Sequence, residues 1–218
     1  MPSPRTPSKK PRTALIVGGS IVAIAILALV IAKLVMSDDD DTKPAKVENS
    51  AGLTLELGDV EVQSAGPPAT ISTAVKQSVL DASQAYVDGA IMSPLEDGKL
   101  DGDYEKVFDA AVRKSATGRD QATVTEVRTG SVKPVKATAT KVRLDGMGDQ
   151  TGKLVLVAAT FGVDLSGKGG VKIKRLTELT FANEQGKWVV TAYRVGVQRS
   201  TSARTTSAVA HAGTGVVS

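Results

Sequence analysis

The longest apolar stretch of the chain is Ala14–Met36, ALIVGGSIVAIAILALVIAKLVM. Its 23 residues include a single charge, Lys33, which lies close to one end. At about 1.5 Å per residue, a helix of this length crosses a hydrocarbon core of about 30 Å. A helix also satisfies its backbone hydrogen bonds internally, as a lipid environment requires. The pattern therefore predicts one transmembrane helix.

Charges on the two sides of this segment predict its orientation. Residues 1–13 contain four basic and no acidic residues, whereas four aspartates, Asp38–Asp41, follow the segment. Since basic flanks tend to stay in the cytoplasm, we expect a single-pass protein of the cell membrane, with a cytoplasmic N-terminus and residues 37–218 extracytoplasmic. A cleaved signal peptide is the alternative. It is disfavoured because the apolar run exceeds the roughly 7–15 residues of a signal peptide, and no small-x-small pattern precedes the aspartates.

Small residues recur along the apolar segment, and small faces let transmembrane helices approach closely. They allow a homodimer through the span, although alanine and glycine are also common in spans that do not associate. The residues concerned are Ala14, Gly18, Ala25, Ala28 and Ala32.

Three stretches have no pattern that would bury a core. Residues 1–13 are rich in Pro, Ser, Thr and basic residues, so we expect a disordered cytoplasmic arm. Residues 37–69 are expected to form a tether that includes one short segment, Leu53–Gln63, in which leucines alternate with polar residues. This segment is expected to be an irregular strand or an extended segment packed on the domain. Residues 199–218 have no period and are expected to be a disordered tail. This leaves residues 70–198 as one extracytoplasmic domain.

The first half of that domain has apolar residues at intervals of three and four, which is the helical period. The first helix has a capping residue in Thr70 or Ser72, and Pro94 is expected to end it. The predicted helices are Thr70–Met92, Asp103–Ala116 and a short one within Arg119–Val127.

In the second half the period changes to two, which is typical of strands. Short turns that contain glycine separate the strands and favour hairpins. The predicted strands are Val132–Leu144, Lys153–Leu165, Val171–Ala182 and Lys187–Gln198. Helices followed by strands predict an α+β fold, with the helices packed on a curved four-stranded antiparallel meander.

Composition excludes several classes of function. The net charge of +4 originates near the N-terminus, because residues 37–218 hold 22 basic and 23 acidic residues. This balance, with only seven aromatic residues in the chain, gives no support for a nucleic-acid partner. The absence of cysteine excludes disulfides and thiolate chemistry.

Charge is nevertheless segregated along the extracytoplasmic part. Residues 37–130 hold 9 basic and 18 acidic residues, whereas residues 131–199 hold 12 basic and 5 acidic ones. One interpretation is a basic sheet surface that meets an anionic partner, since such fields steer encounter. The other is that the two halves neutralise each other across the fold. The candidate partner surface is Lys133, Lys136, Lys141, Arg143, Lys172, Lys174 and Arg175.

Candidate chemistry is sparse. The one histidine, His211, falls in the expected tail, so no folded histidine is available as a base or metal ligand. We therefore predict no catalytic, cofactor or metal site. Carboxylates in the concavity of the sheet remain an alternative, and Tyr86, Asp88 and Tyr193 are a candidate pocket. A packed helix face with a solvated acid is the simpler interpretation of those three residues.

The segment Leu176–Val197, LTELTFANEQGKWVVTAYRVGV, closes the predicted sheet with a hairpin. With the basic N-terminus and the single span, this arrangement resembles small actinobacterial single-pass membrane proteins whose outer domain is of the nuclear transport factor 2-like (cystatin-like roll) type. Mammalian-cell-entry-associated membrane proteins are the family that it resembles most. The resemblance implies an accessory role beside a membrane transport or secretion system, and it implies no catalytic motif.

Three functions follow as hypotheses. The first is a non-enzymatic accessory protein whose outer domain assembles with other membrane or extracytoplasmic subunits through protein–protein interaction. The second is a roll that binds a lipid or another small apolar ligand between helix and sheet. The third is an isomerase- or dehydratase-type enzyme on the same fold, which requires a buried acid in a cavity.

Overall fold

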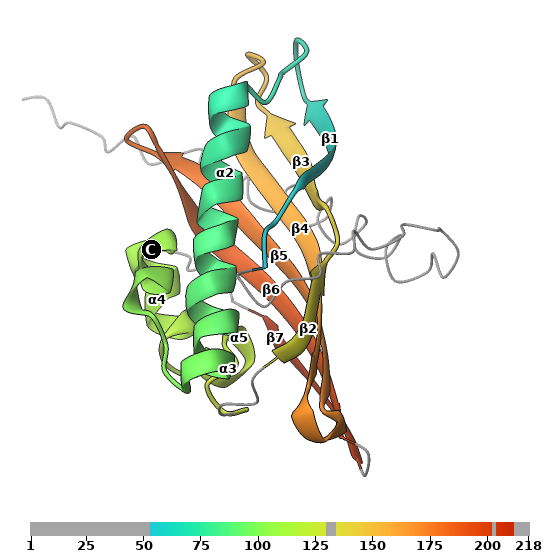
Figure 1. Ribbon diagram of the computed structural model, residues 1–218. Helices are drawn as coiled ribbons and strands as arrows, with labels where there is room; N and C mark the ends of the chain where they lie inside the picture. The colour runs from blue at the N-terminus through green and yellow to red at the C-terminus, as the bar shows by residue number, and fades with distance from the viewer. Residues whose placement is uncertain (1–52, 130–133, 202–203, 212–218) are drawn as a thin grey trace, which may run out of the picture. The chain divides into compact units, whose positions relative to one another are not determined.

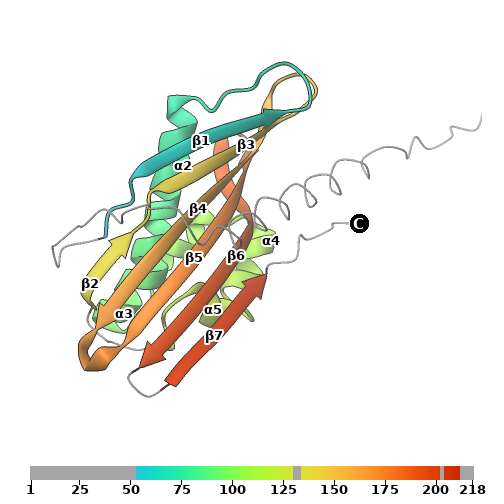
Figure 2. The same cartoon turned by 90° about the vertical axis from the view of Figure 1, so that its right-hand side faces the viewer.

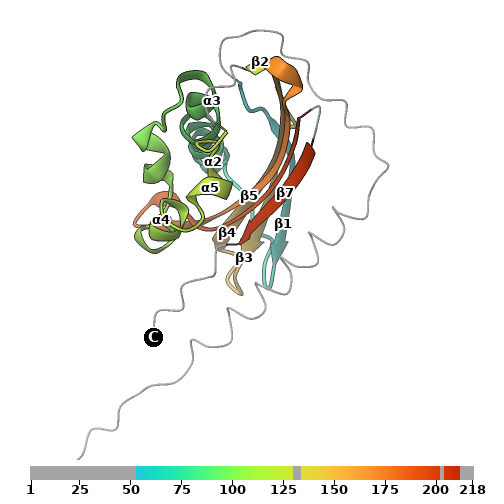
Figure 3. The same cartoon turned by 90° about the horizontal axis from the view of Figure 1, so that it is seen from below.

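One curved sheet carries the fold, and the helices lie against its concave face (Figures 1 and 3). The computed structural model describes residues 53–129, 134–201 and 204–211. All of these residues belong to one compact unit. The α+β class predicted from the sequence is therefore confirmed.

The sheet is mixed and larger than the four strands predicted. Along its main path the order is β1-β3-β4-β5-β6-β7, and β2 pairs with β4 off this path (Figure 2). β1 runs parallel to β3, whereas the other neighbours pair antiparallel. The strands are β1 (Leu57–Ser64), β2 (Pro134–Ala139), β3 (Val142–Gly148), β4 (Leu154–Gly167), β5 (Lys172–Glu184), β6 (Lys187–Thr201) and β7 (Arg204–His211).

Both additional edges come from outside the predicted domain 70–198. β1 forms from the predicted extended segment, and β7 forms from residues expected to be disordered. The prediction of a disordered tail is wrong for residues 204–211, because the backbone of this weakly patterned segment pairs along β6. His211 accordingly lies at the end of a strand, opposite Arg194.

The strand predicted at Val132–Leu144 is divided in two at Thr140. The amide of Thr140 donates to the carbonyl of Gly162 at 3.0 Å, and the amide of Gly162 donates to the Thr140 hydroxyl at 2.7 Å. β2 therefore follows the C-terminal half of β4, and β3 follows its N-terminal half. β3 also runs four residues past Leu144, so the turn begins at Asp149, whose carboxylate accepts from the amides of Thr151 and Lys153.

The long helix also differs from its prediction at its C-terminal end. α2 (Thr73–Tyr86) starts at Ser72, whose hydroxyl accepts from the amide of Val75 as expected. Pro94 does not end the helix: a π-helical turn, η1 (Val87–Met92), leads into α3 (Ser93–Asp97). Proline has no N–H to donate, and it is tolerated because it occupies the first turn of α3. The chain leaves α3 at Gly98, which has the left-handed φ of 73°.

The second predicted helix is interrupted at Phe108. A 3₁₀ turn, η2 (Gly102–Val107), precedes it, and α4 (Ala110–Ala116) follows after Asp109 caps the amide of Val112 at 2.7 Å. Phe108 itself is extended and bridges to Val190 of β6. α5 (Gln121–Val124) completes the helical layer described by the structure.

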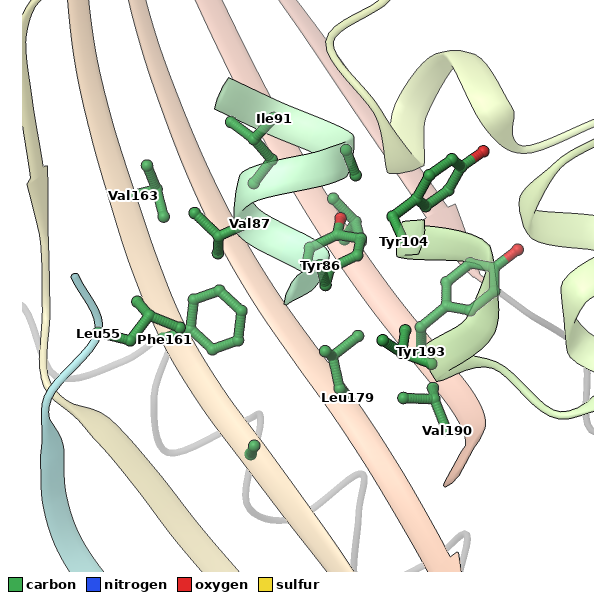
Figure 4. Close-up of a cluster of buried hydrophobic side chains, with 14 of the residues drawn as sticks. Leu55, Tyr86, Val87, Ile91, Tyr104, Phe161, Val163, Leu179, Val190 and Tyr193 are labelled. Atoms are coloured by element: carbon green, nitrogen blue, oxygen red, sulfur yellow. The ribbon is translucent and has the colours of Figure 1, made fainter. Parts of the chain in front are cut away.

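Aromatic rings fill the space between the helices and the sheet (Figure 4). Tyr86, Tyr104 and Tyr193 each contact the ring of Phe108 edge-on, with centroids 6.2, 6.4 and 5.8 Å away. Leu53 and Leu55 join the same core, and Gln84 holds their backbone with two hydrogen bonds of 2.7 Å. The predicted extended segment is therefore part of the domain.

Among the described residues, no helix is both long and apolar enough to cross a bilayer. The predicted span Ala14–Met36, the arm before it and Asp38–Asp41 lie outside the described residues. Lys133 also lies outside them.

The π-helical turn yields the first prediction. A Cβ on Gly89 would lie 2.9 Å from the Cβ of Tyr104 and 3.1 Å from the carbonyl oxygen of Asp101. Gly89→Ala should therefore lower the free energy of unfolding by about 1–3 kcal/mol, measured by chemical denaturation, because two backbone segments must separate. Gly102→Ala is the matched control, since no atom lies within 4 Å of its Cβ position. Equal effects of the two substitutions would contradict the close packing of η1 on η2.

Candidate functional site

Buried charges gather where α5 meets β5 and β6. Glu126 is fully buried and Arg175 is 2% exposed. The Arg175 guanidinium donates through Nη1 to Oε1 of Glu126. Arg199 approaches the same carboxylate from β6, with Nε 3.1 Å from Oε2 and Nη2 3.0 Å from Oε1. Two guanidinium groups therefore hold one carboxylate, and we call Tyr86, Glu126, Arg175 and Arg199 the charge cluster.

Arg175 also binds the helical layer directly. Its Nη2 lies 2.9 Å from the carbonyl oxygens of both Thr123 and Val124, and 3.3 Å from the hydroxyl of Tyr86. The Tyr86 hydroxyl in turn donates to the Val124 carbonyl at 2.6 Å. One side chain of β5 thus connects α2 and α5 to the sheet.

Within the charge cluster the Glu126 carboxylate is fully paired, whereas Nε of Arg175 has no hydrogen-bond partner among the described residues. Both Glu126 oxygens already accept hydrogen bonds, from the two arginines and from the Thr129 hydroxyl. Burial by itself would lower the pKa of Arg175, but Tyr86 and Glu126 outweigh it and the pKa is raised. Burial raises the pKa of Tyr86 despite the opposing effect of Arg175. The Arg175 guanidinium and the Tyr86 hydroxyl therefore stay protonated near neutral pH, which favours a structural role over proton transfer.

The predicted pocket is brought together only in part. Tyr86 and Tyr193 are both buried against Phe108. The Tyr193 hydroxyl donates to Asp120 at 2.7 Å, and its pKa is raised by burial and by this carboxylate. Asp88 is exposed and accepts a hydrogen bond from Gln84 on the neighbouring turn. For Asp88, the interpretation as a solvated acid therefore fits better than a place in a pocket.

Three exposed lysines of the predicted surface lie where the C-terminal half of β4 pairs with β2 on one side and with the start of β5 on the other. Lys136 and Lys172 both pair with Ser166, one from each side, and directly paired residues point to the same face. Lys174 lies two residues further along β5, opposite Asp164. We call Lys136, Lys172 and Lys174 the lysine end.

Arg175 does not belong to this surface, which corrects its assignment. Successive residues of a strand point to opposite faces, so Lys174 and Arg175 cannot both face outward. Exposed Lys174 faces solvent, and buried Arg175 faces the helices. Charge alone suggested the surface, whereas the alternation of Ile173, Arg175 and Leu179 already places the arginine on the apolar side.

Two other members of the predicted surface differ from the lysine end. Arg143 is half-buried, and it forms ion pairs of 3.0 Å with Glu61 and Asp145. Its charge is therefore neutralised locally. Lys141 is exposed at the break between β2 and β3.

The middle of the outer face is less polar than the lysine end. Leu176 of β5 is 45% exposed, and its paired residues on the two neighbouring strands are both glycines. They are Gly162 in β4 and Gly196 in β6. Glu178 follows on β5 and pairs across the ladder with Arg194. Burial raises the pKa of Glu178, and the charge of Arg194 opposes this shift.

Glu126, the centre of the charge cluster, is a site residue that the sequence pattern does not predict. The residue lies in a short polar stretch, TEVRT, where nothing indicates burial. Arg175 had a signal, since it occupies an inward position of an alternating strand. No group of three or more His, Cys, Asp or Glu residues within the described ranges is arranged to hold a metal ion.

Comparison with known proteins assigns no family. No protein-family model matches the chain, and no curated protein or solved structure matches it either. The family resemblance noted for Leu176–Val197 therefore stays a prediction, and the function has to be argued from the geometry.

The charge cluster yields the second prediction. Glu126→Gln keeps the shape of the side chain but leaves Arg175 buried without a counter-charge. It should lower the free energy of unfolding by about 3–5 kcal/mol in chemical denaturation. Glu61→Gln removes the exposed partner of Arg143 and should cost only about 0–1 kcal/mol. A Glu126→Gln protein as stable as the Glu61→Gln control would show that the cluster does not hold the layers together.

Proposed function

We propose that the chain is a non-enzymatic, single-pass membrane protein whose extracytoplasmic domain is an accessory or assembly module of a membrane transport or secretion complex. The observation that carries this proposal is the contrast between the two faces of β5. Its inner charge, Arg175, is used within the fold, whereas its outer charges, Lys172 and Lys174, are exposed. The actinobacterial nuclear transport factor 2-like resemblance is part of the same proposal.

The interior supports a scaffold better than an enzyme or a ligand-binding roll. An isomerase or dehydratase needs an acid or base that a substrate can reach, and Glu126 is fully buried with both oxygens bonded. Tyr86, Phe108 and Tyr193 pack against one another in the space where a roll would hold an apolar ligand. Packed aromatic side chains stabilise the domain. Because they fill this space, we place the binding of a partner on the surface of the domain.

The lysine end supports an acidic protein partner. Lys136 of β2 and Lys172 of β5 lie on either side of Ser166 in β4, at the same level of the sheet. Lys174 lies two residues further along β5. Exposed Asp164 pairs opposite Lys174, so the three ammonium groups leave a reduced but still positive net charge on this part of the sheet. A rigid sheet fixes the position of this charge, which steers an acidic surface into one orientation. In this proposal the partner is another subunit that the same membrane displays.

The membrane topology yields the third prediction. The chain has no cysteine, so a single introduced thiol can be labelled without background. In intact cells a membrane-impermeant maleimide should label Lys187→Cys at the exposed start of β6 and should not label Ser8→Cys. Permeabilised cells should show labelling of both, and the intact mass should retain residues 1–13. Labelling of Ser8→Cys in intact cells, or loss of residues 1–13, would contradict the single-pass topology.

The partner surface yields the fourth prediction. Lys172→Glu combined with Lys174→Glu, in the full-length protein, should reduce recovery of identified membrane subunits after cross-linking and mild detergent extraction by more than about tenfold. Like charges across an interface cost several kcal/mol, and about 1.4 kcal/mol corresponds to a factor of ten. The thermal midpoint should stay near that of the wild type, because both side chains are exposed.

The matched control for this experiment is Lys153→Glu combined with Lys187→Glu. These lysines are also exposed, and they lie just before β4 and at the start of β6, at the opposite end of the sheet. Replacing two lysines with glutamates changes the net charge identically in the two double variants. Recovery should stay unchanged in the control. If both double variants lose the partners equally, net charge and not the lysine end determines assembly. If neither does, the lysine end is not the contact.

A further inference from the structure

The two edges of the sheet differ in how they are protected against pairing with another strand. An exposed edge is a template for strand addition, and proteins usually block it with charges, bulges or covering segments. β1 has such protection: Asp59 and Glu61 are exposed on it, and its register with β3 shifts between Leu57 and Val60.

The edge of β6 is protected in a different way. Its N-terminal half is covered at Val190 by Phe108, and the amide of Asp109 donates to the Val190 carbonyl at 3.0 Å. Its C-terminal half is covered by β7, which pairs with it residue for residue from Thr201↔Arg204 to Arg194↔His211. β7 is the last strand of the sheet path (Figure 2).

β7 carries none of the usual protection in the part that the structure describes. Between Arg204 and His211 its sequence is TTSAVA, with no charge, proline or glycine. Its pairing with β6 has no register shift, so the strand is regular. Nothing else in the described residues continues the sheet beyond it.

We propose that β7 pairs antiparallel with β7 of a second copy of this chain, which joins two sheets edge to edge. When all eight residues of the two strands pair, which we call full overlap, Arg204 of each copy lies opposite His211 of the other copy. All other pairs join two uncharged residues, so no acidic or like-charged pair opposes the contact at neutral pH. A two-fold contact of this kind is self-complementary and closes at the dimer, which prevents growth into a fibre.

The size of the contact explains why a second copy is the fitting occupant. One strand pair of eight residues buries less than the roughly 1,200 Å² of a stable interface, so a dilute partner would bind weakly. Two copies held in one membrane have a raised effective concentration, which compensates for a small contact. The inference uses the membrane anchoring proposed above, but it uses neither the lysine end nor any other subunit.

Disulfide trapping in native membranes tests the pairing with the full-length chain, whose lack of cysteine removes background. In full overlap Ser207 of one copy lies opposite Ala208 of the other, on the same face of the joined sheet. Differently tagged Ser207→Cys and Ala208→Cys chains, coexpressed and oxidised, should therefore form mixed dimers several-fold more readily than two Ser207→Cys chains. The matched control is Gln63→Cys on β1, which should give no dimer.

The alternation of yield with residue number is the decisive result. A strong preference for the Ser207→Cys and Ala208→Cys pair over the pair of two Ser207→Cys chains supports strand pairing in full overlap. The opposite preference also supports strand pairing, with the register shifted by one residue. Equal yields from the two pairs, or no dimer at any β7 position, would overturn the proposal. A dimer formed only through the transmembrane segment belongs to the overturning outcomes, because it gives no such preference at β7. The labelling experiment on Ser8 and Lys187 reports separately on anchoring, so failure of the two proposals can be told apart.

Proline substitution provides a second, independent test. Consecutive residues of an antiparallel strand direct their N–H groups to opposite sides, so of Thr206→Pro and Ser207→Pro only one removes a bond to β6. The other should abolish mixed dimers reported by Thr205→Cys with Ala210→Cys, while the thermal midpoint stays near that of the unsubstituted pair. If neither proline changes the dimer yield, the second copy does not pair along this edge.

Discussion

Burying Arg175 is the constraint on which the rest of the structure depends. A guanidinium ion inside a protein costs several kcal/mol unless it is paired and hydrogen-bonded. Glu126, the hydroxyl of Tyr86 and the carbonyls of α5 meet most of that requirement, because they bond both Nη groups and leave only Nε without a partner among the described residues. Because these partners come from α2, α5 and the residues just after α5, the ion can be satisfied only when the helical layer lies in one position on the sheet. The charge cluster therefore specifies an arrangement, beyond any contribution to net stability.

The same strand connects this interior to the surface. β5 presents Arg175 to the helices and Lys174 to solvent, and their relative position is fixed by one peptide unit. A rigid inner cluster therefore holds the lysine end in place as a preorganised surface. This relation is what an assembly module needs, since a partner then does not have to order the contact residues as it binds.

Period and turn chemistry predicted most strands, because alternation over β4, β5 and β6 is regular and glycines mark the turns. They failed where long-range contacts decide the structure. β7 forms because β6 offers a ladder, and no apolar pattern in TTSAVA indicates it. Pro94 is tolerated because it occupies the first turn of α3, which begins after a π-helical turn that local rules do not anticipate. Glu126 is buried because Arg175 and Arg199 lie beside it, about fifty and seventy positions later in the chain.

The two proposed contacts use different parts of one sheet, and their physics differs accordingly. The lysine end acts through charge on the outer face, so its contribution should decline as salt rises. The β7 edge acts through backbone hydrogen bonds between uncharged segments, which salt screens little. Strand pairing joins two sheets side by side and leaves their outer faces uncovered, so dimerisation would double the number of lysine ends without blocking either. The β7 pairing and the binding of an acidic partner at the lysine end can therefore occur at the same time. Each contact then raises the effective concentration of the groups that form the other.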